Sequence, residues 1–504
     1  MLPDFPAVFR AATGHEPRAY QERLAARLVA GDVPPILDVP TGMGKTLAVL
    51  LAWLYALAAD ADRGGAGDTA GGAAAGDDAG AGGARRVARR LHLVVDRRVV
   101  VDDAHRCARD LERRIARADA GPLAQLAEVL RERLDLAPDE PVLEVRRLRG
   151  GLPRDLTEHT RNPARPAIVL GTLDMTCSRL LFRGYQLSPR RRSIDAALTG
   201  LDSWWVLDEA HLSTQARTTL ETLQTRESAL EDRFGGAVPG LRVMAMSATP
   251  GGTAEGALTW DAAQEEARDP DLARRRRARD AVPVSVVEAA GSGVDAVVAA
   301  AAGIVPALGR GEGLVVFCTT VADAKAVRTR LGKSCKKHGA ALELLTGGMP
   351  ERFARGVVDR LGAYRTGCED REEADPVVVV ATSTLEVGAD LDFTHLITRA
   401  CDADSLIQRL GRVNRVGARE DGSATIIHTD KSDPIHGEAA DAVVRLIAGA
   451  TTLGEAVARL RNAPDPAALR RPRQEPVVIP PTVLRAYVRT AGSRNDPPVA
   501  PWIR

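Results

Sequence analysis

Residues 35–46 read Pro-Ile-Leu-Asp-Val-Pro-Thr-Gly-Met-Gly-Lys-Thr, and this stretch decides the fold. An apolar strand runs into a turn that contains Gly42 and Gly44, and the pattern predicts a helix from about Lys45. Glycines let backbone N–H groups close around phosphate oxygens, and a helix N-terminus adds favourable partial charge. We therefore expect Lys45 to reach the β- and γ-phosphates of a nucleotide and Thr46 to bind Mg²⁺.

The loop also admits a plainer interpretation, because the strict phosphate-loop pattern has glycine where this chain has Val39. The alternative is an ordinary glycine-rich turn between a strand and a helix. Lys45, at the expected place, is the single lysine among the first 300 residues. This favours a nucleotide loop, in which Pro40, Thr41 and Met43 would also line the site.

Residues 204–211 read Trp-Trp-Val-Leu-Asp-Glu-Ala-His. An apolar strand thus delivers two adjacent carboxylates at its C-terminal end, where α/β sheets place their ligands. Asp208 suits a Mg²⁺ contact, and Glu209 suits orienting and deprotonating an attacking water. Alone, such a pair is commonly a solvated turn. After a phosphate loop it is a candidate Walker B element.

Three later stretches add to this pattern: residues 246–250 (Met-Ser-Ala-Thr-Pro), 381–392 and 408–415. The first is weak by itself, because small hydroxyl residues often cap helices. Arg412 and Arg415 are three apart, so we expect them to share a helix face and to stabilise charge on a transferring phosphoryl group. The alternative is a basic helix face in solvent.

Continuous apolar runs alternate with longer helical stretches, which predicts an α/β fold with parallel sheets covered on both faces. The expected strands are Pro35–Val39, Leu91–Val95, Ala167–Leu170, Trp204–Leu207, Val243–Met246, Val284–Val287, Leu314–Phe317, Val377–Ala381 and Leu396–Ile397. We expect one domain over residues 1–280, a second over 281–430, and a helical, proline-rich tail over 431–504. Residues 60–84 are almost wholly Ala, Gly and Asp and predict a flexible insertion.

Composition narrows the class of protein. The chain has 504 residues, 45% of them hydrophobic, and a net charge of +1, which excludes a wholly disordered chain and a protein coated in basic residues. No apolar run is long enough to span a membrane, and the start shows no secretory signal. The six cysteines form no Cys-x-x-Cys pair, so we expect a reduced, cytoplasmic protein without a common zinc site.

Taken in order, residues 40–46, 208–211, 247–249, 382–392 and 408–415 resemble the motifs of superfamily 2 DEAD/DEAH-box helicases. In that family Val39 is no departure. The resemblance implies two tandem RecA-like domains of the P-loop NTPase type with ATP in the cleft between them. It implies a catalytic set of Lys45, Asp208, Glu209, Arg412 and Arg415.

The same resemblance assigns further residues. Gln21 would read adenine, and Gly388 and Asp390 would join the nucleotide site. Residues expected to couple ATP hydrolysis to movement are Ser247, Thr249 and Gln408. Residues expected to grip the nucleic-acid backbone are Arg97, Thr172 and Thr382.

Residues 94–103, 180–185 and 387–393 are similar to one branch, the CRISPR-associated helicases of type I systems, most nearly the I-G form. That resemblance implies an antiviral motor, recruited by the Cascade complex to an R-loop, which moves 3′→5′ on the displaced single-stranded DNA. In that family an HD nuclease, fused to the motor or separate from it, cuts the DNA, and its metal ligands include a His-Asp pair. No such pair occurs among the nine dispersed histidines, so we expect the nuclease to lie in another chain or beyond this sequence. The alternatives are an RNA-remodelling DEAH-box helicase, a restriction-type translocase, and an ATP-switched clamp that does not unwind.

Overall fold

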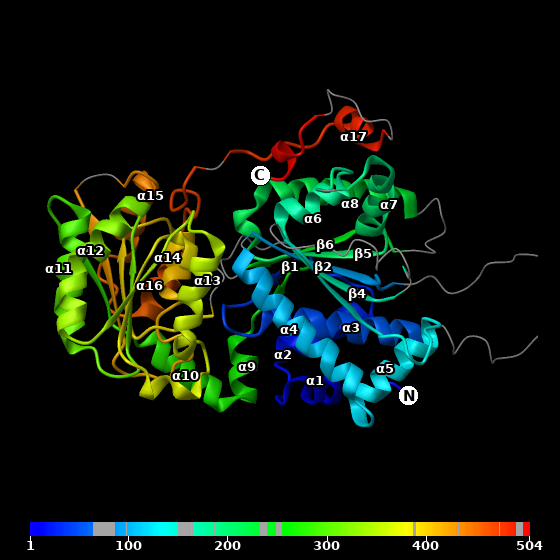
Figure 1. The fold of residues 1–504 in the computed structure, drawn as a ribbon, viewed down its shortest axis with the longest axis horizontal. Coiled ribbons are helices and arrows are strands. Elements are labelled where there is room, and N and C mark those ends of the chain that lie inside the picture. Colours follow the sequence, from blue (N-terminus) through cyan, green and yellow to red (C-terminus); the bar gives the residue numbers. More distant parts are fainter. Residues whose placement is uncertain are drawn as a thin grey trace, which may run out of the picture. The chain divides into compact units, whose positions relative to one another are not determined.

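A computed structural model shows the chain as two compact units, Met1–Arg268 with Glu475–Arg504, and Asp269–Gln474. The structure describes residues 1–63, 86–96, 98–149, 163, 165–185, 187–231, 239–247, 255–386, 390–430, 433–472, 474–489 and 497–504. Each unit has its own parallel sheet (Figure 1). The structure therefore confirms an α/β fold with two sheet domains.

Unit 1 is built on a seven-stranded sheet with the order β3-β4-β2-β5-β6-β1-β7. All of its strand pairs are parallel, so the carboxyl ends of the strands meet at one edge. The strands are β1 (Ile36–Asp38), β2 (Arg90–Val95), β3 (Glu144–Leu148), β4 (Ala167–Thr172), β5 (Ser203–Leu207), β6 (Arg242–Ser247) and β7 (Leu258–Thr259).

Helices cover both faces of this sheet (Figure 1). One face carries α1 (Phe5–Thr13), α2 (Ala19–Val29), α3 (Lys45–Arg63), α4 (Arg98–Arg117) and α5 (Gly121–Arg133), and the other carries α6 (Leu173–Leu180), α7 (Pro189–Gly200) and α8 (Thr214–Glu231). Helix α9 (Ala262–Arg268) ends the first part of the unit. Successive residues of β2 enter opposite cores, Leu93 and Val95 one and Val94 the other, which explains why the strands are apolar without alternation.

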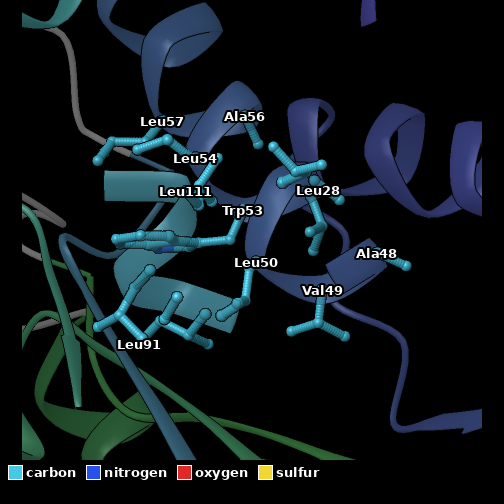
Figure 2. Packing of buried hydrophobic residues seen from close by; sticks show 14 of the residues in the cluster. Leu28, Ala48, Val49, Leu50, Trp53, Leu54, Ala56, Leu57, Leu91 and Leu111 are labelled. Carbon is cyan, nitrogen blue, oxygen red and sulfur yellow. The ribbon is translucent and has the colours of Figure 1, made fainter. Parts of the chain in front are cut away.

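The helix that follows the phosphate loop is anchored by a large apolar face. Figure 2 shows Trp53 and its neighbours on α3 packed against Leu91 of β2 and Leu111 of α4. Trp53 is fully buried, and its indole N–H donates to the carbonyl oxygen of Ala88 over 2.7 Å. Burial of this face fixes the start of α3, and with it the loop that precedes it.

Unit 2 is built on a six-stranded parallel sheet with the order β10-β11-β9-β12-β13-β8. Its strands are β8 (Val284–Ala289), β9 (Gly313–Phe317), β10 (Ala341–Leu345), β11 (Val377–Ala381), β12 (His395–Arg399) and β13 (Ser423–Thr429). Helices α11 (Gly293–Ile304) and α12 (Val321–Lys337) pack on one face. The other face carries α13 (Glu351–Arg360), α14 (Ala403–Leu410), α15 (Gly437–Ile447) and α16 (Leu453–Arg461).

All nine strands expected from apolar runs are present. The expectation missed β3, β7, β10 and β13. Three of these, β3, β7 and β10, are edge strands, and β3 reads Glu-Val-Arg-Arg-Leu, so it lacks the continuous apolar run of a central strand.

The units differ from the domain boundaries expected at residues 280 and 430. Helix α10 (Pro270–Asp280) belongs to unit 2, where the backbone of Arg275 lies so close to Gly417 that a Cβ there would be 1.8 Å from the Arg275 carbonyl oxygen. The expected tail is divided: residues 431–474 complete unit 2, and 475–504 return to unit 1. The insertion expected at 60–84 lies mostly outside the described residues, and α3 extends to Arg63.

Candidate nucleotide site and motif-bearing loops

The phosphate loop connects β1 to α3 as the sequence predicted. Val39 is fully buried, and Gly42 and Gly44 have φ values of 82° and 81°, which favour glycine. Lys45 is the first residue of α3, and its Nζ donates to the carbonyl oxygen of Val39 over 3.0 Å. The lysine therefore folds back across the loop, with Thr46 beside it in the first turn of the helix.

Gln21 lies beneath this loop. Its Nε2 is 3.4 Å from the position a Cβ would take at Gly44, and it donates to the Tyr20 hydroxyl over 3.3 Å. The Tyr20 hydroxyl in turn donates to the carbonyl oxygen of Met43 over 2.7 Å. Gln21 Oε1 accepts from the backbone N–H of Arg18, so the amide braces the loop from α2.

Sequence reasoning missed Glu265, which holds the start of α2. Its two carboxylate oxygens accept from the backbone N–H groups of Ala19 (3.0 Å) and Tyr20 (2.7 Å), and the side chain is buried. This is an N-terminal cap supplied from α9. A separation of more than 240 residues left no local signal for it.

The Asp-Glu pair follows β5 as expected. Burial, and next the charge of Glu209, raise the pKa of Asp208 to about 6, while nearby Lys45 opposes the shift. Glu209 has φ 48° and ψ 50°, a left-handed conformation that is costly for a residue with a Cβ. Its Oε2 lies 3.4 Å from His211 Nδ1. The Glu209 side chain is 12% exposed, so a strained backbone holds a largely buried carboxylate directly after β5.

Ser247 ends β6, the strand between β5 and β1. It is paired in register with Asp38 at the end of β1, so the Ser-Ala-Thr stretch begins between the phosphate loop and the Asp-Glu pair. Thr249 lies outside the described residues, as do Gly388 and Arg97. Three motif-bearing loops of unit 1 therefore converge on neighbouring strand ends.

In unit 2 a buried ion pair links the stretches 381–392 and 408–415. Arg409 donates from Nε to Glu386 Oε1 over 2.7 Å, and from Nη1 to Thr398 Oγ1 over 2.8 Å. Arg412 donates from Nη2 to the backbone carbonyl of Glu386 over 2.6 Å. Gln408 is also buried in α14.

The expectation that Arg412 and Arg415 share a helix face is wrong. Helix α14 ends at Leu410, and Asn414 has φ 42°, which interrupts helical geometry. Both arginines lie on the turn beyond the helix. Arg415 Nη2 lies 3.3 Å from Asp390 Oδ1, and its backbone N–H donates to Asp392 Oδ1 over 2.7 Å.

The start of α14 is braced by residues without a recognised motif. Asp402 caps the helix by accepting from Ser405 N–H over 2.9 Å. It also contacts His436 Nδ1 at 2.9 Å and Arg471 Nε at 2.5 Å. Residues 433–471, which the sequence left uninterpreted, thus hold the helix that carries Gln408.

Two expected nucleic-acid contacts lie at strand ends. Thr172 ends β4 immediately before α6, and Thr382 follows β11. The Thr382 hydroxyl accepts from the Gly347 backbone N–H over 3.3 Å, which places the loop after β10 beside it. This loop was not predicted from the sequence because β10 was not predicted.

The described residues include no group of three or more His, Cys, Asp or Glu side chains that could hold a metal by themselves. A cation at Asp208 would therefore need ligands of other kinds, such as the Thr46 hydroxyl, the nucleotide or water. Among the described helices, none has the length and apolarity required to cross a membrane.

Residues 310–418 match the family model described as "CRISPR-associated nuclease/helicase Cas3, C-terminal". The crystal structure of T. fusca Cas3 with ATP superposes with a TM-score of 0.60 at 18% identity, over 93% of this chain and 54% of that one. The chain has a Cas3-like helicase fold. It spans about half the length of T. fusca Cas3.

The same fold extends to other superfamily 2 helicases. Mycobacterium smegmatis Lhr bound to single-stranded DNA and AMP-PNP matches with a TM-score of 0.51 at 19% identity, over 88% of this chain and 50% of Lhr. The DEAD-box helicase Mss116 bound to single-stranded RNA matches with a TM-score of 0.50 at 12% identity, over 89% of this chain and 76% of Mss116. No curated protein matches the sequence. The Cas3-like assignment and the tandem RecA-like fold agree with the resemblance stated from sequence.

Proposed function

We propose that the chain is an ATP-driven motor of the Cas3 type that acts on single-stranded DNA in a type I CRISPR antiviral system. The observation that carries the proposal is the convergence of Lys45, Asp208 and Glu209 at one edge of the unit 1 sheet. Similarity to Cas3 supports the CRISPR context, and the Lhr complex supports single-stranded DNA as the substrate class.

The unit 1 residues fit a nucleotide with Mg²⁺. Lys45 already bonds to a loop oxygen, and a phosphate oxygen would replace the Val39 carbonyl as its acceptor. The pKa of Asp208 is raised first by burial and next by the charge of Glu209, and a cation held by Asp208 and Thr46 would stabilise both groups as carboxylates. Bound there, Mg²⁺ would neutralise charge on the phosphates.

Glu209 is proposed to orient the attacking water and accept its proton. Glu209 Oε2 is buried and accepts no hydrogen bond, although His211 Nδ1 lies 3.4 Å away. The carboxylate can therefore still accept a hydrogen bond, and then a proton, from a water molecule. In the proposed cycle unit 2 supplies Arg412 and Arg415 to stabilise charge on the transferring phosphoryl group. Arg415 would first have to leave its ion pair with Asp390 in order to contact the phosphoryl group.

Nucleic-acid contacts are proposed at Thr172 and Thr382, with Arg97, and the grip should be mostly on phosphates and thus weakened by salt. We propose 3′→5′ movement, recruitment by Cascade, and an HD nuclease supplied by another chain or domain. Gln21, which braces the phosphate loop, is proposed to sense the adenine from that position.

Steady-state ATPase activity tests the proposal, measured with single-stranded DNA, with single-stranded RNA and without nucleic acid, beside the Lys45→Ala variant. We expect Lys45-dependent activity that DNA alone stimulates. Stimulation by RNA alone would indicate an RNA remodeller and refute the CRISPR proposal. A Lys45-dependent rate with no strand displacement in an unwinding assay would indicate an ATP-switched clamp.

A further inference from the structure

Residues 475–489 and 497–504 have no role in the function proposed above, although three of their side chains join the core of unit 1. Ile479, Tyr487 and Ile503 are at most 2% exposed and join the apolar cluster formed by α6, α8 and the sheet. Figure 1 shows α17 (Pro481–Val488) on the side of the unit 1 sheet that carries α6, α7 and α8. The segment is therefore an integral part of unit 1.

Two parts of the segment, Val477 near its start and Trp502 near its end, contact α8. The Gln215 side chain accepts from Val477 N–H over 2.8 Å and donates to the Val477 carbonyl over 2.9 Å. One turn later the Thr219 hydroxyl donates to the Trp502 carbonyl over 2.7 Å. Helix α8 begins at Thr214, a few residues after Glu209, so these contacts fix the first turns after the Asp-Glu loop.

The middle of the segment, at the last turn of α17, contacts the turn after α6. The Arg183 guanidinium donates to the backbone carbonyls of Tyr487 (3.0 Å) and Ala486 (3.3 Å) and lies 4.9 Å from the centre of the Tyr487 ring. The turn has an unusual backbone, because Phe182 adopts a left-handed conformation with φ 60°. It also requires glycine at position 184, where a Cβ would lie 2.5 Å from a neighbouring side chain. This is the Leu-Leu-Phe-Arg-Gly-Tyr stretch at 180–185, for which the sequence suggested no chemistry.

A third contact reaches the first turn of α6. Arg504 Nε pairs with Asp174 Oδ1 at 2.8 Å, two residues after Thr172. Strand β2 separates β4 from β5, so the loops that begin α6 and α8 are not adjacent through the sheet. The segment contacts both helices directly.

We propose that the described residues 475–489 and 497–504 form a coupling strap that transmits the nucleic-acid state of the β4–α6 loop to the Asp-Glu loop before α8. This inference rests on the proposed function, since it presumes that the two loops bind nucleic acid and hydrolyse ATP. A displacement of α6 pulls on the Arg183 and Arg504 contacts. The strap, in which Ile479, Tyr487 and Ile503 are buried, carries this displacement to Gln215 and Thr219. Arg183, Gln215 and Arg504 are positioning residues in this scheme.

Two substitutions each remove one contact of the strap without emptying the core: Arg183→Met acts at α17, and Gln215→Ala acts at Val477. The matched control is Arg485→Met, which removes an exposed arginine from the same α17 helix. Hydrogen exchange of residues 481–488 measures docking in the full chain. ATPase rates with and without an oligothymidylate measure coupling.

We expect Arg183→Met to speed exchange in 481–488 by about tenfold or more, because two charge-assisted hydrogen bonds are lost. In both strap variants the DNA-independent ATPase should stay within about twofold of the parent, while stimulation by DNA should fall about threefold or more. Arg485→Met should change neither quantity. A merely structural strap would not separate the two rates in this way.

Faster exchange with full DNA stimulation would overturn the coupling role, and unchanged exchange in Arg183→Met would overturn the docking. Equal loss of the basal and the stimulated rates would assign these residues to folding alone and also refute coupling. A parent protein without Lys45-dependent ATPase would instead refute the proposed function, and the coupling with it, while the exchange data would still decide whether Arg183 docks the segment.

Discussion

The buried pair of Arg409 and Glu386 provides a direct test of how unit 2 holds its motifs. The arginine is 1% exposed and the glutamate 7%, and Arg409 also donates to Thr398. Arg409→Met would leave the Glu386 carboxylate buried without its cation. We expect the free energy of unfolding of unit 2 to fall by about 3–5 kcal/mol.

Replacing both partners should be less harmful than replacing one. In Arg409→Met with Glu386→Leu no charge remains to be desolvated, so we expect stability within about 2 kcal/mol of the parent. Arg328→Met, which removes an exposed arginine of α12, is the control and should change stability by less than about 0.5 kcal/mol.

The assay must report unit 2 alone. All five tryptophans, at positions 53, 204, 205, 260 and 502, lie in unit 1, so tryptophan fluorescence reports that unit. Hydrogen exchange of the slowest amides in β9 and β11 gives the opening free energy of unit 2. A loss below about 1 kcal/mol in Arg409→Met, or a double variant less stable than the single one, would refute the reasoning.

Three further predictions concern unit 1. Glu209→Gln should lower ATP turnover about 10²- to 10⁴-fold while leaving nucleotide affinity within a few-fold, measured by single-turnover kinetics and equilibrium binding; parental turnover would remove Glu209 as the base. Burial and the charge of Glu209 raise the pKa of Asp208 from 3.8 to about 6, so the folded state binds this proton more tightly than the unfolded chain does. The contribution of Asp208 to the free energy of unfolding of unit 1 is therefore fully present below pH 3.8 and is lost as the pH rises through 6. Asp208→Asn should abolish this part of the pH dependence in chemical denaturation followed by fluorescence, and an unchanged pH profile would contradict it. Trp53→Ala should cost about 3–5 kcal/mol in the same assay, read from the remaining tryptophans, and a cost below about 1 kcal/mol would contradict the packing in Figure 2.

Features that depend on neighbouring residues could be predicted from the sequence alone. Apolar runs predicted nine strands, and all nine are present in the structure. They could be predicted because a strand covered on both faces needs apolar residues throughout. Lys45 and Asp208 could be proposed as site residues because a phosphate loop and a strand-end carboxylate occupy short, contiguous stretches. The resemblance to superfamily 2 helicases rested on the same short stretches, and it anticipated the Cas3-like fold.

The support that distant segments give to those motifs became visible in the folded structure. Glu265 caps α2, His436 contacts Asp402, and Arg183 donates hydrogen bonds to α17. Each contact joins residues far apart in the chain, so no local sequence pattern predicts it. The division of the expected tail between the two units has the same origin, since its apolar residues fit either core by composition. A motif is local because its chemistry requires a fixed spacing, whereas its support depends on which side chains the folded sheet brings within about 3 Å of one another.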